Sequence, residues 1–366
     1  MKNISRRKFL FASVTAGIAS SQVAHSVQAQ PSPPTSDEII ADEMAADEII
    51  ATDETLDALL GSERLASDRS PDNLSDSSTS PLIPYDRDIS RLLIRCSRLG
   101  MEQFAQGQRD RRYDGSIRAL EDFPRELEPY TQAATFRVEL DATTTLLPDL
   151  GQIGRRLTRR AIPPTLAFIG FVLTSETHNI ILFRGTSNPK EWMANFQSGQ
   201  SNYGRLRGAQ GRVHTGFLRL YNRLSRQVRQ AANTLNPSLP CFIAGHSLGG
   251  ALATLAAADL AYHYPTLREQ IRLYTYGAPR VGNQAFVEYL KTIAPNSYRV
   301  LNMADMVTMV PPANLREQQY SHFGEAWVFL DYAQGSVSLS HSTSIYQEAI
   351  DQQIETNAIP NFPTSC

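Results

Sequence analysis

The feature of this sequence that most restricts its fold is a short glycine-rich segment, Gly245–Gly249, which reads Gly-His-Ser-Leu-Gly. An apolar run starting at Cys241 precedes it, and a run of small apolar residues, Ala251–Ala261, follows it. This order predicts a strand, a tight turn and a helix, with Ser247 at the tip of the turn. Glycine is required two positions before and after the serine because strand and helix approach too closely there for a Cβ atom. The alternative is a purely structural glycine turn, but the flanking strand and helix favour a nucleophilic serine.

A nucleophilic serine needs a base within hydrogen-bond reach and a carboxylate that orients the base. In folds with this turn, the carboxylate and then the histidine follow the serine along the chain. Asp305 fits the first position because it comes directly after a predicted strand, Tyr298–Met303. The other acidic candidates lie inside predicted elements, in the order helix, strand and helix: Asp259, Asp331 and Asp351.

Two histidines follow Asp305 in the chain. His341 lies in the loop between the last predicted strand, 326–332, and the final predicted helix, 343–356, whereas His322 precedes that strand. We therefore predict Ser247, Asp305 and His341 as the catalytic residues. His322 is interpreted as a structural residue or part of the site wall, His246 as a support for the turn, and His214 as a structural or site-lining residue.

A second loop is predicted to stabilise negative charge on a reacting oxygen. The strand Asn179–Phe183 ends in Arg-Gly-Thr, and Thr186 is then placed to point its backbone N–H at an oxyanion. The matching second donor is the N–H of Leu248, the residue after the nucleophile. The alternative is an ordinary strand-to-loop exit.

A lid is predicted beside this site, in the segment that begins at Pro189. Trp192, Met193 and Phe196 would share one face of a short helix that covers apolar substrate space. The alternative is a helix packed into the core. No metal or other cofactor is expected, because the sequence has no HExxH motif and no Cys/His cluster at ligand spacing.

Residues 81–366 are long enough for one large α/β domain with a sizeable core. Residues 107–150 give no clear pattern. The predicted helices are 89–104, a helix that Val213–Phe217 opens and that runs to Gln230, the small-residue run 251–261, and 284–292. The predicted strands also include 166–173 and 271–276. Cys241 is predicted to be a buried free thiol, whereas pairing of Cys96 with Cys366 stays open because spacing alone does not fix disulfide geometry.

Several motifs in fixed order resemble those of the class 3, or fungal lipase-like, lipases. They are Ile181–Thr186, Trp192, Val213–Phe217, Gly245–Gly250, Tyr276–Asn283, Asn302–Asp305 with Val310–Pro312, and Tyr320–His322. The resemblance covers roughly residues 165 to 345. It implies an α/β-hydrolase fold, with a central, mostly parallel sheet flanked by helices and a short helical lid. It also implies lipid ester substrates, matches Ser247, Asp305 and His341 to the triad, and matches Thr186 to the oxyanion position. The stretch of sequence between Asp305 and His341 contains few residues for this family.

The N-terminal part has a different composition. Residues 1–29 predict a twin-arginine-type signal peptide, with Arg6 and Arg7 before a modest apolar run and Val27-Gln-Ala29 as a cleavage site. Residues 30–80 contain no aromatic residue and carry a net charge of −11, which is typical of a disordered acidic linker; the alternative is a pro-segment. Residues 81–366 carry +5, too small a basic excess to indicate nucleic-acid binding.

The sequence thus predicts an exported serine hydrolase, periplasmic or extracellular, that acts on lipid esters at an oil–water or membrane interface. Triacylglycerol lipase is the leading hypothesis. An esterase or a phospholipase A of the same fold is the alternative, and a non-catalytic lipid-binding module is a third. No later segment is apolar over enough residues to span a membrane, so a mature protein without a transmembrane helix is expected.

Overall fold

The computed structural model describes residues 83–140, 165–186, 199–203, 211–315, 317–332, 336 and 339–352. All of them belong to one compact unit, residues 51–366. The predictions made for residues 1–80, for the lid residues Trp192, Met193 and Phe196, and for Cys366 lie outside the described residues.

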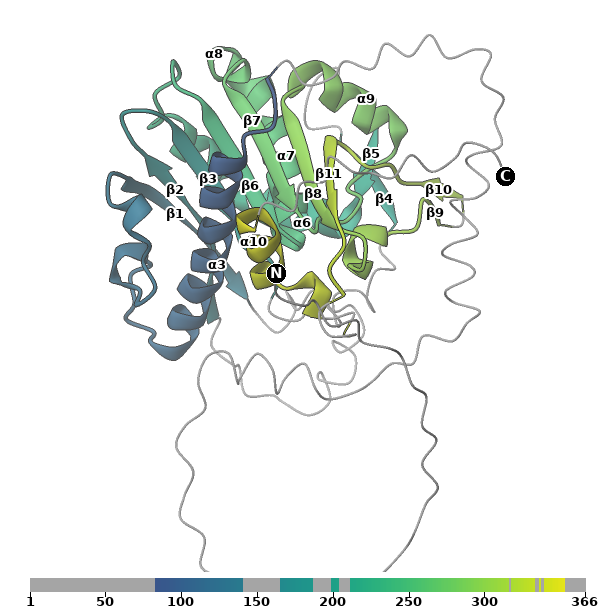
Figure 1. The fold of residues 1–366 in the computed structure, drawn as a ribbon. Coiled ribbons are helices and arrows are strands. Elements are labelled where there is room, and N and C mark those ends of the chain that lie inside the picture. Colours follow the sequence, from purple (N-terminus) through teal and green to yellow (C-terminus); the bar gives the residue numbers. More distant parts are fainter. Residues whose placement is uncertain are drawn as a thin grey trace, which may run out of the picture. The chain divides into compact units, whose positions relative to one another are not determined.

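A seven-stranded sheet forms the centre of this unit (Figure 1). In spatial order its strands are β1 (Thr131–Leu140), β2 (Thr165–Thr174), β3 (Asn179–Phe183), β6 (Cys241–His246), β7 (Ile271–Tyr276), β8 (Ser297–Asn302) and β11 (Glu325–Phe329). The pairings from β3 to β11 are parallel, and β2 runs antiparallel to both of its neighbours. Parallel strands end at one shared edge, so the loops that follow them lie side by side.

The remaining strands among the described residues form two short antiparallel sheets of two strands each. They are β4 (Gln200–Asn202) with β5 (Arg212–His214), and β9 (Asn314–Leu315) with β10 (Gln318–Gln319). The longer helices are α3 (Arg87–Arg109), α6 (Thr215–Ala232), α7 (Leu248–His263), α9 (Gln284–Ile293) and α10 (Thr343–Asp351). Short helical turns are α8 (Pro265–Arg268), η2 (Ile117–Ala119), η3 (Arg125–Leu127), η4 (Met306–Met309) and η6 (Leu339–His341).

Helices cover both faces of the sheet, and alternation along the strands divides the core between them. In β3, Ile181 and Phe183 join the core with α6, α7 and α9, whereas Ile180 and Leu182 join the core with α3 and α10. The two faces are also visible in Figure 1, where α3 and α10 lie on one side and α6 and α7 on the other. Burial on both faces explains why the central strands read as continuous apolar runs.

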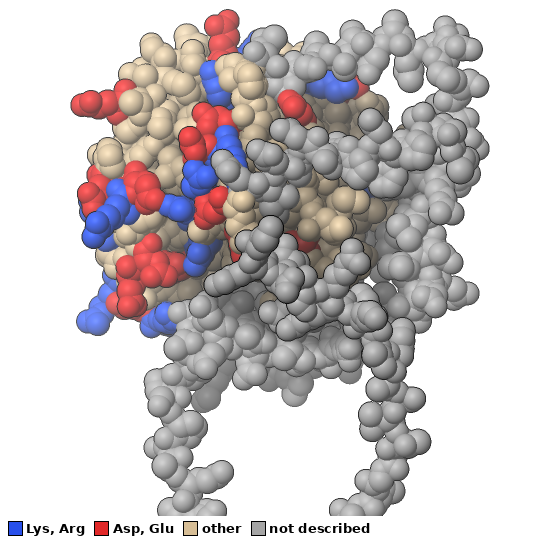
Figure 2. Space-filling view, viewed as in Figure 1, with Lys and Arg blue, Asp and Glu red and all other residues tan. Residues whose placement is uncertain are grey.

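The α3 face carries charged side chains of both signs, interspersed with one another (Figure 2). Arg91 forms ion pairs with Asp88 and with Asp351 of α10, and Arg95 pairs with Glu126. These partly exposed pairs are worth little individually. No described helix is long and apolar enough to cross a membrane.

The element predictions are largely confirmed, with differences at three places. Residues 107–150, which gave no clear sequence pattern, contain β1. Its register shifts at Gln132/Ala134 and Phe136/Arg137 break the alternation of a regular strand. The last strand ends at Phe329, so the placement of Asp331 within a strand was wrong. The final helix ends at Asp351. Cys241 is a buried free cysteine as predicted, and Cys96 is buried and free as well.

The close approach predicted around the serine turn is confirmed. A Cβ atom built on Gly245 would lie 2.3 Å from backbone atoms of Gly249, and one on Gly249 would lie 2.2 Å from the carbonyl oxygen of Phe183. Both contacts are with backbone, so side-chain movement cannot relieve them.

Gly249→Ala is expected to lower the free energy of unfolding by about 2 kcal/mol or more, because the end of β3 or the start of α7 must shift. Gly100→Ala is the matched control: its Cβ would lie 3.2 Å from Leu182 Cδ2 and 3.3 Å from Arg184 Cβ, and alanine favours a helix interior. Urea unfolding of both variants checks this; equal stabilities would contradict the close-packing argument.

Candidate active site

Ser247 occupies the turn between β6 and α7 in a strained backbone conformation. Its φ is 58° and its ψ is −129°, and it is the one non-glycine residue with positive φ among the described residues. Its N–H donates to the carbonyl of Tyr276 at 2.9 Å, which ties the turn to the end of β7. Strain of this kind costs about 1–3 kcal/mol and persists only where the surrounding packing enforces it.

His341 and Asp305 meet across the carboxyl edge of the sheet. Asp305 follows β8, and His341 ends η6, just before α10. The Nδ1 atom of His341 lies 2.7 Å from Oδ2 of Asp305, and both side chains are buried. Because the carboxylate accepts, Nδ1 carries the proton and Nε2 is the unprotonated nitrogen of the neutral ring.

Two buried polar atoms at this site have no hydrogen-bond partner among the described residues: Oγ of Ser247 and Nε2 of His341. Buried polar atoms are almost always satisfied, so each of these two atoms needs an explanation, and a shared role in catalysis would supply one. A hydroxyl and an unprotonated imidazole nitrogen are also complementary, and such contacts are often long in the absence of substrate.

Tyr346 is a member of the site that sequence reasoning missed. Its hydroxyl donates to Oδ2 of Asp305 at 2.6 Å and accepts from the N–H of Asn302 at 3.1 Å. Burial first, and then the charge of Asp305, hold the pKa of Tyr346 well above 10, so the hydroxyl stays protonated. Asp305 also accepts from the N–H of Val307 through Oδ1 at 2.9 Å. No sequence signal distinguishes Tyr346 from an ordinary core tyrosine of α10.

His246 was interpreted as a support for the turn, and its side chain also contacts His341. Its Nε2 lies 2.7 Å from the carbonyl oxygen of His341, and the two rings are 4.5 Å apart between centroids. Because the partner is a carbonyl, Nε2 of His246 donates. Burial first, and then the charge of His341, lower the pKa of His246 well below 6.5, so the ring is neutral.

The predicted oxyanion loop packs directly against the serine turn. A Cβ atom on Gly185 would lie 3.0 Å from the carbonyl oxygen of His246 and 3.2 Å from Cβ of Ser247. The buried guanidinium of Arg184 holds this loop by donating to the carbonyls of Phe168 at 2.7 Å and Gly185 at 2.5 Å. Desolvation by burial lowers the pKa of Arg184 to about 9. Thr186 comes directly after Gly185 in this loop.

Leu248 begins α7 beside the same turn. The first N–H groups of a helix have no acceptor within the helix, and the positive end of the helix dipole lies there. The N–H groups of Leu248 and Thr186 are therefore the candidate donors to an oxyanion, from two elements that meet at Ser247.

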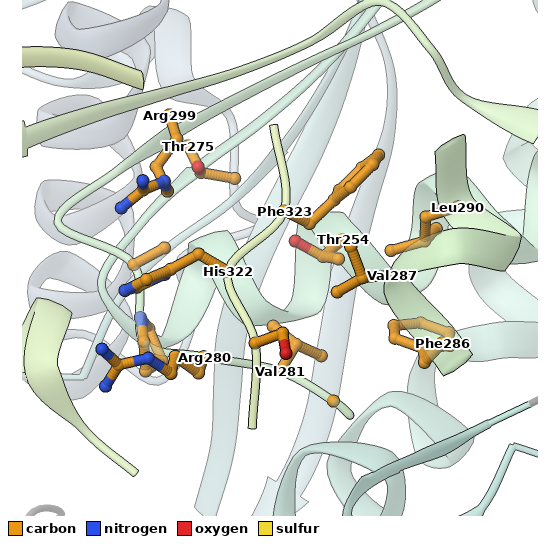
Figure 3. A pocket seen from close by; sticks show the side chains of 14 residues that line it. Thr254, Thr275, Arg280, Val281, Phe286, Val287, Leu290, Arg299, His322 and Phe323 are labelled. Carbon is orange, nitrogen blue, oxygen red and sulfur yellow. The ribbon is translucent and has the colours of Figure 1, made fainter. Parts of the chain in front are cut away.

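His214 lies at the start of α6, and His322 lies between β10 and β11. His214 caps α6, accepting from the N–H of Phe217 at 3.4 Å. His322 lines a pocket between α7 and α9 together with Arg280, Arg299 and Thr275, as Figure 3 shows. Neither Ser247 nor His341 lines that pocket.

Two arginines, Arg280 and Arg299, line this pocket beside His322. Burial first, and then the charges of Arg299 and Arg280, lower the pKa of His322 well below 6.5. Arg280 donates through Nη1 to the carbonyls of Met309 at 2.5 Å and Pro311 at 2.9 Å. These bonds connect the pocket to the end of η4, the short helix that follows Asp305 in the chain. The interpretation of His322 as a structural residue or part of the site wall stays a prediction.

The competing carboxylates are engaged elsewhere. Asp259 is buried in α7 and accepts from Tyr221 Oη at 2.8 Å and from Arg229 at 2.8 and 2.9 Å. Asp351 pairs with Arg91. The described residues include no cluster of three or more His, Cys, Asp or Glu side chains that would hold a metal ion.

Comparison with known proteins supports this description of the fold. Residues 180–315 match the family described as Lipase (class 3). The chain is 38% identical over 137 residues to a secreted mono- and diacylglycerol lipase of Fusarium solani, covering 36% of this chain and 39% of the relative. It is 32% identical over 161 residues to a chloroplastic/mitochondrial phospholipase A1 of Oryza sativa subsp. indica, covering 38% and 35% of the two chains.

A solved lipase–propeptide complex of Rhizomucor miehei shares the fold, with a TM-score of 0.50 and 20% identity. The similarity covers 74% of this chain and 79% of that chain. The mostly parallel sheet with helices on both faces is that of the α/β-hydrolases. The chain spans less than two fifths of the length of the two sequence relatives named above.

Tyr346→Phe is expected to lower the free energy of unfolding by about 1.5–3 kcal/mol, because a buried carboxylate loses one of its donors. Tyr264→Phe is the control: its hydroxyl donates to a neutral carbonyl, that of Arg229, and its loss is expected to cost about 0.5–1.5 kcal/mol. Urea unfolding at neutral pH compares the two. A smaller loss for Tyr346→Phe than for Tyr264→Phe would contradict the role given to Asp305.

Stability is expected to fall as the pH drops below about 6.5, by up to about 1.4 kcal/mol per pH unit for each buried neutral histidine. The sign follows from the lowered pKa values of His246 and His322: the unfolded chain binds a proton there before the folded chain does. Urea unfolding measured across this range should show a shallower dependence for His246→Gln. An unchanged slope would contradict the burial of a neutral ring.

Proposed function

We propose that this chain is a serine hydrolase that cleaves carboxylic ester bonds of lipids, as a triacylglycerol lipase. The match of residues 180–315 to the class 3 lipase family supports the proposal. The observation that carries the proposal is the buried pair of His341 and Asp305, 2.7 Å apart, beside a serine held at φ 58°. This arrangement suits acyl transfer through a covalent intermediate.

In the proposed reaction, Oγ of Ser247 attacks the ester carbonyl while Nε2 of His341 takes the hydroxyl proton. His341 then gives that proton to the leaving alcohol, and the acyl group stays on Ser247. Water, deprotonated by the same nitrogen, attacks the acyl-enzyme. The bond between Oγ of Ser247 and the acyl carbon then breaks, His341 returns the proton to Oγ, and the acid is released. Asp305 keeps Nδ1 protonated and stabilises the imidazolium, and Tyr346 holds Asp305 in place.

The N–H groups of Thr186 and Leu248 are proposed to stabilise the oxyanion of each tetrahedral intermediate. Such preorganised donors act on charge that develops only as the reaction proceeds, and losing one costs about 3–4 kcal/mol in the barrier. Trp192, Met193 and Phe196 are proposed as the apolar face of a lid, an assignment that rests on their sequence pattern.

A phospholipase A is the second candidate for the substrate class, favoured by the phospholipase A1 relative from rice. A dissolved-ester esterase shares the same chemistry, whereas a lipid-binding module without catalysis would not need the buried pair. Export is proposed as well: the Fusarium solani relative is described as secreted, and residues 1–29 carry the twin-arginine pattern. Periplasmic and culture-medium fractions of the native host should contain the protein without residues 1–29.

The test is acid release by the full chain from emulsified long-chain triacylglycerol, from a phospholipid dispersion and from a dissolved short-chain ester. Ser247→Ala is expected to lower every rate by at least about 1,000-fold, since the nucleophile is removed. Faster hydrolysis of the triacylglycerol supports the lipase, and faster hydrolysis of the phospholipid supports the second candidate. Cleavage of the dissolved ester alone would indicate an esterase, and no cleavage at all would leave a binding module.

A further inference from the structure

Arg184 is a buried cation in the loop that carries a proposed oxyanion donor. Its guanidinium donates through Nε to the carbonyl of Phe168 at 2.7 Å and through Nη1 to the carbonyl of Gly185 at 2.5 Å. The ring of Phe104 in α3 covers the guanidinium, with 3.7 Å between Cζ and the ring centroid. None of these partners in the described part of the chain is a carboxylate, so neutral groups hold the positive charge.

Holding a carbonyl does not by itself require a charged side chain. The buried Gln103 of α3 donates to the carbonyl of Gly115 at 2.7 Å through a neutral amide. Gln227 likewise holds the N–H and the carbonyl of Arg137, at 2.9 and 2.8 Å. A buried cation without a counter-ion is costly, because burial penalises the charged form. With its pKa at about 9, Arg184 is still positive at neutral pH, so the charge needs a further explanation.

The bond from Arg184 fixes the direction of the next N–H group in the loop. The peptide between Gly185 and Thr186 is trans and planar, so its C=O and its N–H point in opposite directions. Because the carbonyl points at Arg184, the N–H of Thr186 points away from it. Glycine permits rotations that would turn this peptide over and reverse both groups. The guanidinium therefore selects one of two orientations.

The guanidinium and the start of α7 lie on opposite sides of this loop. Phe104, which covers the guanidinium, belongs to α3, and α3 and α7 cover opposite faces of the sheet (Figure 1). On the α7 side, a Cβ atom built on Gly249 would lie 2.7 Å from the carbonyl carbon of Arg184. Because the N–H of Thr186 points away from the guanidinium, it points toward the side on which Ser247 lies.

The charge of Arg184 also bears on the strength of this donor. A positive group bonded to a peptide carbonyl polarises the peptide, which strengthens the N–H at its other end as a donor. In a buried site of low dielectric, a fixed positive charge attracts a developing oxyanion more strongly than it would in water. Arg184 is already held in place by its hydrogen bonds, so this attraction costs no reorganisation during the reaction.

We propose that Arg184 is a positioning residue for the oxyanion: through the Gly185 carbonyl it aims the N–H of Thr186 toward Ser247 and strengthens it as a donor. The inference rests on the proposed function and adds a charged group that acts without touching the substrate. Negative charge develops on the ester oxygen only when Oγ of Ser247 attacks. Arg184 is therefore expected to stabilise the tetrahedral intermediate more than the bound ester.

The test is hydrolysis of a dissolved short-chain ester by the full chain and by Arg184→Met, which removes the charge and the donors. kcat/KM is expected to fall about 100-fold with KM within about threefold, because an oxyanion donor is worth roughly 100- to 1,000-fold in rate. Phenylboronic acid, which forms a tetrahedral anion on a serine hydroxyl, is expected to bind more weakly by a similar factor. Arg184→Lys, which keeps the charge, should recover at least about tenfold of the lost kcat/KM.

Arg268→Met is the matched control. Nε of Arg268 donates to the carbonyl of Ala261 at 2.8 Å, near the C-terminal end of α7, whereas Ser247 precedes the first residue of that helix. Its kcat/KM and its affinity for phenylboronic acid are expected to stay within about threefold of those of the full chain, since no oxyanion donor is disturbed.

Two results would overturn the proposal: kcat/KM of Arg184→Met within about threefold of the full chain, or a loss of kcat/KM without a matching loss of affinity for phenylboronic acid. Thermal unfolding checks that Arg184→Met is folded. If it is not, Arg184→Gln, a neutral amide, takes its place and is expected to lose at least about tenfold in both quantities. Failure of the proposed function is distinguishable: the full chain would then cleave the ester no faster than Ser247→Ala, and the inference would fall with it.

Discussion

The contact on which the site depends is the close approach of two backbones, where the start of α7 meets the end of β3. Gly249 touches the carbonyl of Phe183 with no space for a Cβ atom, and Gly245 touches Gly249 in the same way. Packing this tight leaves the intervening residue few conformations, so Ser247 is held at positive φ. The strain is stored locally and is opposed by burial of α7 on every side.

The same edge of the sheet must also hold a buried carboxylate, which is costly unless it is fully hydrogen-bonded. Asp305 meets this condition with three donors: the N–H of Val307, Nδ1 of His341 and the hydroxyl of Tyr346. These donors come from η4, η6 and α10, so the carboxylate gathers three separate elements of the C-terminal part. Removing any one donor would weaken both the packing of these elements and the orientation of His341.

Much of this arrangement follows from local sequence, and the rest depends on contacts that no local pattern records. Long buried runs predicted β2, β3, β6 and β7, because strands covered on both faces have no polar alternation. Glycine spacing predicted the serine turn, because its cause is a local steric one. Tyr346 was missed because a buried tyrosine of α10 has the same local pattern whether or not it bonds a carboxylate. Asp331 was misplaced because apolar Leu330 and Tyr332 read as a continuation of the strand, although both are exposed.

The two neighbouring imidazoles of His246 and His341 show why position and ionisation must be set together. With ring centroids 4.5 Å apart, His246 and His341 would repel strongly if both were charged, and burial would make that repulsion worse. In the proposed reaction His341 becomes positive, so its neighbour must be neutral at the pH of catalysis. Donation from His246 to the carbonyl of His341 fixes the backbone of the proposed base, while desolvation keeps the donor ring uncharged. Burial of His246 therefore orients His341 without competing for its proton, which a solvated histidine at the same position would not achieve.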